Sequence, residues 1–363
     1  MYTNLRPAYK VNEVTTEWLE QALREARLIN GDKITHLEYS ACGTGQLADS
    51  YRFSISYDRP SSGPKTVVAK FPSEDPTSRE FARANGFYKS EIEFYQTIRP
   101  GLDLSAPVAL FAALDANECD FMLVMEDIGE TRSVDQNAGC TPDDAANVVR
   151  QAAMLHAGSW GNKKLQQVPW LKSIGSAFVQ VTENFSDITN MFRSNFGDVV
   201  SEECFQVAEK SLSASRAWID VLQRPVCLWH SDFRADNLLF DAGNQNGLVT
   251  VLDWQTLGYG SGTIDMSHFL TLSLETEVRR QHEEGLVKEY HEALVSNGVE
   301  GYSLEECWQD YRVNSLYSLQ SGIFAANQVK RTPRGDEMWR IWVERATVQV
   351  QDHDTIELLT RRR

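Results

Sequence analysis

Several oxygen-bearing side chains lie close together in one short and otherwise apolar stretch of this sequence. The segment LWHSDFRADNLLFD, residues 228–241, contains Asp232 and Asn237, and Asp253 follows it in VLDWQ. A carboxylate and an amide oxygen held together suit a hard cation such as Mg2+, which prefers oxygen ligands and completes its shell with water and substrate phosphates. Asn237 and Asp253 are therefore the candidate metal ligands, and they indicate nucleotide chemistry.

The remaining carboxylate of this group has a different use. Asp232 can orient an attacking hydroxyl group and accept its proton, which is the task of the general base in phosphoryl transfer. It is the candidate catalytic residue. The alternative interpretation is that Asp232, Asn237 and Asp253 are turn residues that cap strands.

A β-hairpin must bring these residues together. In NLLFDAGNQNGLVTVLDW, the apolar runs NLLF and LVTVLD flank DAGNQNG, whose Asp, Gly and Asn residues favour a turn. Folding the ribbon back brings Asn237, at the start of the first predicted strand, near Asp253, at the end of the second. Asp232 lies in the loop just before the first strand, so three polar side chains converge at the open end of one hairpin.

Composition narrows the class of protein. The 363 residues are 42% hydrophobic, enough for a large core divided between two lobes. A formal net charge of −16 argues against a nucleic-acid or membrane partner, because both need a positive protein surface. No apolar run approaches the roughly 18 residues that span a bilayer, and we expect a cytoplasmic protein. Six scattered cysteines without C-x-x-C spacing predict reduced thiols, not disulfides or a zinc site.

The hydrophobic periodicity changes near residue 130. Before it, short strand-like runs dominate, in THLEYSAC, SYRFSISYD, KTVVAKF and FMLVME, interrupted by one predicted helix over 79–98. After residue 140 the pattern is helical and opens with Thr141-Pro142-Asp143-Asp144, which offers a side-chain cap and a proline at the first helical position. Further predicted helices lie at 201–222, 275–296, 304–330 and 336–350, and the Asp232 and Asp253 region is the only hairpin-like interruption among them.

This layout predicts an α+β fold with a small β-rich lobe and a larger, mainly helical lobe. The expected domains are an N-terminal lobe over 1–125, a hinge over 126–140 and a C-terminal lobe over 141–363. The C-terminal lobe would carry the catalytic loop and the acceptor site.

The motifs, in order, resemble a known family. His230-Ser231-Asp232 followed by Asn237 matches the H-x-D-x-x-x-x-N catalytic loop of kinase-like phosphotransferases, and Asp253 takes the place of the Asp-Phe-Gly aspartate. The order VVAK, EIEFY, LVMEDIG, MLHAGSWG, HSDFRADNLLF, VLDWQ and GTIDMSHFL looks like the aminoglycoside phosphotransferase and choline kinase superfamily over roughly 35–275. Asp-Trp-Gln is closest to the ecdysteroid kinase-like branch and its bacterial relatives, where Asp-Phe-Gln is usual.

The resemblance implies a bilobal protein-kinase-like fold and phosphorylation of a small molecule's hydroxyl group that depends on ATP and Mg2+. It also implies a strand lysine that reaches the nucleotide phosphates and a helical glutamate that holds it. Lys70, which ends TVVAK, fits the first role, and a solvated strand-end lysine is the alternative. Glu91 fits the second role because it lies three and four positions before Phe94 and Tyr95, with Glu93 as the other choice.

Two further parts of the nucleotide site follow from the resemblance. Gly43 and Gly45 in CGTGQLADSY can form the turn that covers the phosphates, although the third glycine of G-x-G-x-x-G is missing and an ordinary hairpin turn explains them as well. The backbone from Glu126 to Ile128, after the apolar run FMLVM, would hydrogen-bond the adenine; acidic turn residues are the alternative. Ser231 stands where a glycine is common in the family, and it removes no ligand.

Several other residues have structural explanations. We expect Asp265 to brace the catalytic loop, His230 to pack and hydrogen-bond within it, and His156 to be a satisfied core histidine. The competing functional hypothesis is a catalytically silent nucleotide-binding or scaffold protein. A metallohydrolase lacks the extra His/Asp cluster it would need, and no G-x-S-x-G elbow supports a serine hydrolase. The acceptor is not identified by the sequence: most aromatic residues of the C-terminal helices are expected to pack in the core, among them Trp308, Tyr311, Tyr317, Trp339 and Trp342.

Overall fold

The computed structural model describes residues 5–43, 45, 47–221, 226–242, 247–329 and 331–361. The chain divides into two compact units. The first consists of Met1–Gly101, Ala106–Glu130 and Asp253–Gln255, and the second of Leu102–Ser105, Thr131–Leu252 and Thr256–Arg363.

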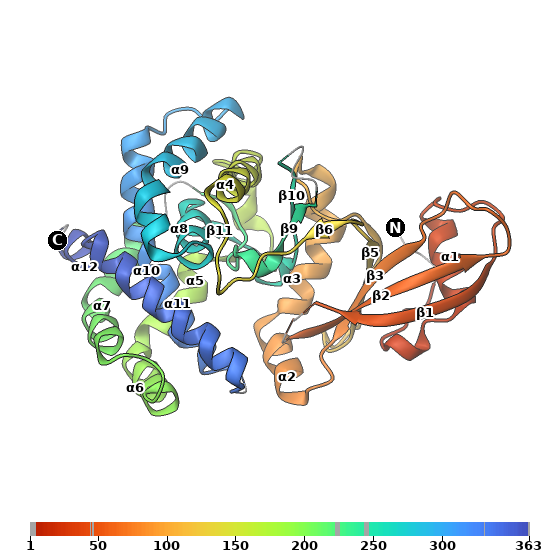
Figure 1. The fold of residues 1–363 in the computed structure, drawn as a ribbon, viewed down its shortest axis with the longest axis horizontal. Coiled ribbons are helices and arrows are strands. Elements are labelled where there is room, and N and C mark those ends of the chain that lie inside the picture. The colour runs from red at the N-terminus through yellow and green to blue at the C-terminus, as the bar shows by residue number, and fades with distance from the viewer. Residues whose placement is uncertain are drawn as a thin grey trace. The chain divides into compact units, whose positions relative to one another are not determined.

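The first unit is built on a five-stranded antiparallel sheet, whose first strands are the red and orange arrows of Figure 1. The strand order is β1-β2-β3-β5-β4, so β3 lies in the centre. The strands are β1 (Ile34–Cys42), β2 (Ala48–Tyr57), β3 (Thr66–Pro72), β4 (Ala109–Leu114) and β5 (Phe121–Glu126). Four of them match predicted runs; β4 was not predicted.

Helices complete the first unit. They are α1 (Thr16–Glu25), α2 (Pro76–Asn85) and α3 (Phe87–Glu93), followed by a π-helical turn at Phe94–Ile98, with 3-10 turns at Val11–Glu13 and Arg99–Gly101. The single helix predicted over 79–98 is wrong, because Gly86 adopts a left-handed conformation (φ 72°) that ends α2 and starts α3 in a new direction. The α1 residues Leu19 and Leu23 pack on the core side of the sheet against Phe53, Val67 and Phe111.

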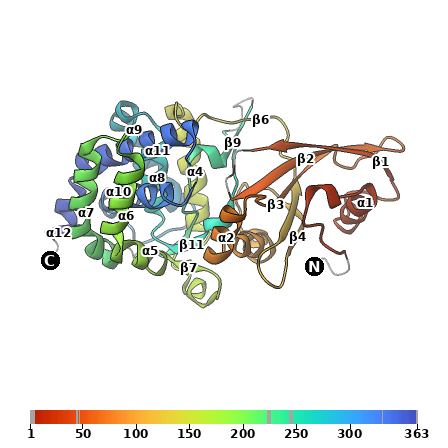
Figure 2. The same cartoon turned by 90° about the horizontal axis from the view of Figure 1, so that it is seen from below.

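The second unit is mainly helical (Figure 2). Its helices are α4 (Pro142–Ala157), α5 (Ile174–Glu183), α6 (Phe185–Phe196), α7 (Glu202–Val221), α8 (Thr263–Ser273), α9 (Thr276–Ser296), α10 (Leu304–Ala326), α11 (Pro333–Asp352) and α12 (Thr355–Thr360), with a 3-10 turn at Lys163–Gln167. The sequence did not predict α5, α6, α8 or α12. Helix α10 packs against both α8 and α11, and all eleven α8 residues are buried. A helix buried on every side has no amphipathic period, which is why the pattern missed it.

The predicted hairpin is present. Strand β9 (Leu238–Asp241) pairs antiparallel with β10 (Val249–Val251), and β6 (Thr131–Arg132) adds a third strand beside β9. Residues 243–246 of the predicted turn lie outside the described residues. A second small sheet joins β7 (Lys172–Ser173), β11 (Gly258–Gly260) and β8 (Cys227–Trp229), so the hairpin is not the only interruption among the helices, as the sequence had suggested.

The described part of the chain holds no helix that combines the length and the apolarity needed to cross a membrane. The six cysteines are free thiols. The two units differ from the predicted domains: residues 102–105 group with the helical unit, residues 253–255 group with the first unit, and the predicted hinge over 126–140 is divided after Glu130.

Candidate active site

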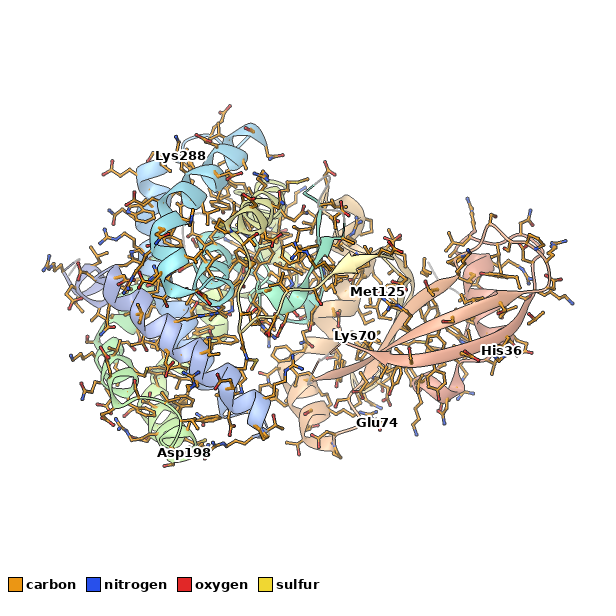
Figure 3. All side chains as sticks on the ribbon, viewed as in Figure 1. His36, Lys70, Glu74, Met125, Asp198 and Lys288 are labelled. Atoms are coloured by element: carbon orange, nitrogen blue, oxygen red, sulfur yellow. The ribbon has the colours of Figure 1, made fainter. Side chains whose placement is uncertain are left out.

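A buried lysine forms the centre of the first unit's polar cluster. Lys70 lies on the central strand β3, opposite Leu123 of β5, and its side chain is only 9% exposed (Figure 3 labels it). Its Nζ lies 2.8 Å from Oε1 of Glu91 on α3, whose side chain is 2% exposed. Phe94 and Tyr95 face the core of this unit, as expected, and Glu91 is the glutamate that contacts the lysine.

Asp253 supplies the second carboxylate on Lys70. Its Oδ1 lies 3.0 Å from the lysine Nζ, and Gln255 Nε2 donates to its Oδ2 at 3.3 Å. The residue adopts φ 62°, a left-handed conformation that few non-glycine residues hold. The Trp254 ring stacks on Phe94 with 3.9 Å between ring centroids. These contacts explain why residues 253–255 belong to the first unit.

Burial and neighbouring charges shift the pKa values of this cluster in opposite directions. Burial by itself lowers the pKa of Lys70, but the carboxylates of Asp253 and Glu91 outweigh it, so the net pKa is raised and the ammonium stays charged. Burial raises the pKa of Glu91, although the Lys70 charge opposes the change. A lysine is almost never this deeply buried without partners, and this one has two.

The second unit holds the loop that contains Asp232. The loop follows β8 and leads through a 3-10 turn (Ala235–Asn237) into β9. Asn237 Nδ2 donates to both the main-chain oxygen and Oδ2 of Asp232, each at 2.8 Å. Arg234 Nε donates to the other carboxylate oxygen, Oδ1, at 2.8 Å, and its Nη1 donates to Asp236 Oδ2 at 2.6 Å.

These contacts set the charge of Asp232. Burial raises the pKa of its carboxyl, but the positive charge of Arg234 and the interactions with His268 and His230 outweigh burial and hold the pKa well below its usual range. Asp232 is therefore ionised and accepts hydrogen bonds only.

Asp265 fixes the backbone of the same loop. Its buried carboxylate, on α8, accepts a hydrogen bond from the His230 N–H at 2.6 Å and another from the Ser231 N–H at 2.9 Å. His156 Nε2 lies 3.2 Å from the same carboxylate, and its Nδ1 bonds the Tyr290 hydroxyl at 2.7 Å. These contacts agree with the structural explanations expected for Asp265 and His156.

His230 also has the structural contact expected of it. Its ring is fully buried, and Nε2 lies 2.8 Å from the main-chain oxygen of Leu252. The N–H of Leu252 in turn donates to the main-chain oxygen of Asn237 at 2.9 Å, which continues the β9–β10 pairing up to the residue that precedes Asp253.

The remaining candidates lie at the ends of strands in the first unit. Gly43 directly follows β1 and adopts φ 81°, and a Cβ on Gly45 would lie 3.0 Å from the Ala48 carbonyl oxygen, so both positions suit glycine. Glu126 ends β5, and its carboxylate and its N–H both bond the backbone of Val108. Ile128 follows in the segment after β5 and is half-buried.

Each unit by itself offers donor atoms of the kinds that nucleotides and hard cations bind. Asn237 uses its amide nitrogen on Asp232, which leaves the amide oxygen as the atom that can bind a cation. In the first unit, Asp253 offers a carboxylate oxygen, and Lys70 is a charged donor of the kind that binds phosphates. Carboxylate and amide oxygens are the ligands that Mg2+ takes.

Sequence reasoning missed three side chains around Asp232. Arg234 was inside the quoted catalytic-loop segment, two residues after Asp232, and His268 was inside GTIDMSHFL, three residues after Asp265. Tyr317 was counted as core, and it is buried, yet its hydroxyl bonds the main-chain oxygen of Ser231 at 2.8 Å. No local sequence pattern predicts that His268 and Tyr317, which are distant in sequence, lie beside this loop.

Comparison with known proteins decides the family. The model of the ecdysteroid kinase-like family matches residues 45–299. The chain belongs to the ecdysteroid kinase-like family. This confirms the superfamily that the order of motifs predicted.

One curated relative of this ecdysteroid kinase-like chain has low sequence identity to it. A Caenorhabditis elegans protein named uncharacterized oxidoreductase dhs-27 is 25% identical over 364 residues, which cover 90% of this chain and 43% of that protein. The chain thus spans less than half the length of that curated relative.

Two solved structures show the same fold. A microcompartment-associated aminopropanol kinase has a TM-score of 0.55 at 12% identity, over 94% of this chain and 99% of that one. The GDP complex of aminoglycoside 2'-phosphotransferase-IIIa has a TM-score of 0.53 at 12% identity, over 92% and 98%. The predicted α+β, kinase-like fold with a β-rich N-terminal part and a larger helical C-terminal part is confirmed.

Proposed function

We propose that this ecdysteroid kinase-like protein is an ATP-dependent phosphotransferase that phosphorylates a hydroxyl group of a small molecule. The observation that carries the proposal is the buried Lys70, held between Glu91 and Asp253. Burying three ionisable side chains costs free energy, and hydrophobic residues of the same volume would often be as stable. A charged cluster at this position is expected where it acts on a ligand.

Each residue has a role in this proposal. Lys70 binds the nucleotide phosphates and Glu91 positions it. The turn with Gly43 and Gly45 covers the phosphates, and the backbone from Glu126 to Ile128 hydrogen-bonds the adenine. The contacts of Lys70 are the main support for these roles.

Asp232 orients the acceptor hydroxyl and takes its proton as the hydroxyl oxygen attacks the γ-phosphate in line. Because Asp232 has a lowered pKa, orientation contributes more to the rate than proton abstraction. Asn237 and Asp253 would hold the metal ion, and Mg2+ would supply charge neutralisation on the phosphate oxygens. Asn237 also anchors Asp232 through its amide nitrogen.

The solved structures that share the fold agree with this reaction class. One is named an aminopropanol kinase, and another is an aminoglycoside phosphotransferase with bound GDP. We extend to this chain only the shared chemistry, transfer of a phosphoryl group to a hydroxyl, with no membrane or nucleic-acid partner.

The test is ATP consumption across a library of alcohols, read by mass spectrometry as an added phosphate. We expect one or more alcohols to gain a phosphate, and Asp232→Asn to lower turnover roughly 10²-fold or more. Asp253→Asn should weaken the dependence on magnesium. Asp143→Asn, an exposed aspartate in the first turn of α4, is the matched control and should leave turnover unchanged.

One observation favours a second function, a catalytically silent nucleotide-binding protein. Arg234 already occupies Oδ1 of Asp232, and a carboxylate held this way is a weak base. Under this alternative the protein binds ATP, yet no alcohol gains a phosphate, and wild type and Asp232→Asn consume ATP at the same background rate.

A further inference from the structure

His268 lies in a rigid setting on α8. The ring is 1% exposed, and its Nδ1 is 2.9 Å from the Ser318 hydroxyl on α10. The rings of Tyr317 and Trp342 pack against it edge-on, each with 5.1 Å between centroids. Contacts on both sides and one hydrogen bond leave the imidazole a single orientation.

That orientation aims the other ring nitrogen at Asp232. Nε2 of His268 is buried and makes no hydrogen bond with any residue that the structure describes. It lies 3.9 Å from Oδ1 of Asp232, about 1 Å longer than an N–H···O hydrogen bond. A buried polar nitrogen without a partner is destabilising, so its position beside the candidate base requires an explanation.

The contacts of the Asp232 carboxylate supply that explanation. An ionised carboxylate has about four lone-pair positions, two on each oxygen. Arg234 takes one on Oδ1, and His268 faces the same oxygen. Asn237 takes one on Oδ2. If His268 takes the second position on Oδ1, the position that remains is on Oδ2.

We propose that His268 is a positioning residue for Asp232: its Nε2–H donates to Oδ1 in the reacting enzyme, which turns Oδ2 toward the acceptor hydroxyl. This inference rests on the proposed role of Asp232. A shift of about 1 Å of the loop or of α8 completes the hydrogen bond. Asp265, one turn earlier on α8, already holds the same loop through its backbone, so one helix fixes both the loop and its carboxylate.

The proposal requires one tautomer of a neutral ring. Burial lowers the pKa of His268, and Arg234 lowers it too, while Asp232 and Asp265 oppose them; the net pKa is lowered and the ring is neutral. A neutral imidazole has one N–H. If Nε2 carries the hydrogen, Nδ1 must accept a hydrogen bond from the Ser318 hydroxyl, which the 2.9 Å distance permits.

Nitrogen NMR of the full chain tests the tautomer without any activity. The protein has seven histidines, and the His268 signals are those missing from His268→Gln. We expect the Nε2–H tautomer, with a signal that shifts in Asp232→Asn. A hydrogen on Nδ1 would overturn the proposal. An Nε2–H signal whose chemical shift is the same in Asp232→Asn would overturn it too.

A double-mutant cycle tests the effect on turnover, measured as hydrolysis of MgATP with water as the acceptor. We expect His268→Phe, which keeps the ring volume but has no donor, to lower kcat about 10- to 100-fold with KM for ATP unchanged. His268→Gln should recover part of the loss. In an Asp232→Asn background, His268→Phe should change kcat less than about twofold, because the partner is already lost.

A structural role gives a different pattern. If His268 only fills space, Phe and Gln variants lower kcat in proportion to their loss of stability, and the effect adds to that of Asp232→Asn. His291→Phe is the matched control, because His291 bonds the Tyr302 carbonyl elsewhere in the helical unit. Failure of the proposed function is distinct: wild type and Asp232→Asn would then hydrolyse ATP at the same background rate, while the NMR result would still decide the tautomer and the contact.

Discussion

Tyr317 donates its hydroxyl to the main-chain oxygen of Ser231 at 2.8 Å, and Ser231 holds a left-handed backbone (φ 78°). The Ser231 hydroxyl lies 2.8 Å from the same phenol oxygen. A residue on α10 thus supports the strained position directly before Asp232. Left-handed conformations of non-glycine residues cost about 1–3 kcal/mol and persist where the surroundings enforce them.

Substitution of Ser231 should show how much of this strain the loop tolerates. We expect Ser231→Gly to stay within about 1 kcal/mol of wild type, because relief of backbone strain offsets the lost hydroxyl contact. Ser231→Val should lose about 1–3 kcal/mol, since a β-branched residue is poorly tolerated at positive φ. Urea unfolding measures both. Ser213→Val, on the exposed side of α7, is the control and should cost about 0.5 kcal/mol or less.

Two helical glycines should respond in opposite directions to alanine. A Cβ at Gly322 on α10 would lie 2.5 Å from Trp342 Nε1, so Gly322→Ala should cost about 1–3 kcal/mol through overpacking against the ring that contacts His268. Gly285 on α9 is exposed and has open space, so Gly285→Ala should gain about 0.5–1 kcal/mol. Equal thermal unfolding shifts for the two variants would contradict the packing argument.

The sequence predicted the parts of the fold that are local. The hairpin of β9 and β10 follows from alternating apolar runs and turn residues, and the start of α4 follows from the Thr141 cap with Asp144, which forms a full capping box. The break at Gly86 was missed because an aromatic spacing continues across it. The all-buried α8 was missed because it has no polar face.

The same difference between local and long-range contacts applies to the candidate site. The spacing from His230 to Asn237 is local, so the sequence could assign chemistry to it. The packing of His268 and Tyr317 against the loop depends on how α8 and α10 meet, and a single sequence does not encode that contact as a pattern. Arg234 was visible in the motif, but its bridge between Asp232 and Asp236 requires coordinates.

Loss of the Asp265 carboxylate should loosen the catalytic loop. Asp265→Asn keeps the volume but turns one acceptor into a donor that faces a backbone N–H, at a cost of about 1.5–3 kcal/mol. Because the loop backbone carries Asp232, ATP turnover should fall roughly tenfold to a hundredfold. Urea unfolding and MgATP hydrolysis measure the two effects. Full turnover in a destabilised variant would show that Asp265 supports the fold alone.

Removal of the Lys70 charge should make stability depend on pH. Burial raises the pKa of Glu91, so the folded state favours the neutral acid, and its contribution to stability is lost as pH rises through that pKa. In Lys70→Met the opposing charge is gone and the Glu91 pKa rises further. The variant should lose little stability near about pH 5 and about 3–5 kcal/mol near about pH 8, where Glu91 ionises without its countercharge.

The pH effect can be assigned to the buried cluster by two further variants. Lys70→Met with Glu91→Gln should have a flatter pH profile, because the group that titrates has been removed. Lys89→Met removes a lysine from a pair with Glu118 in which both side chains are exposed by a third or more, and such a pair contributes about 0–1 kcal/mol. Urea unfolding between about pH 5 and about pH 8 provides the comparison. Equal losses of stability in Lys70→Met and Lys89→Met at every pH would contradict the prediction. Lys70 would then not be a charged group that is strongly coupled to Glu91 and Asp253, and the nucleotide assignment depends on that coupling.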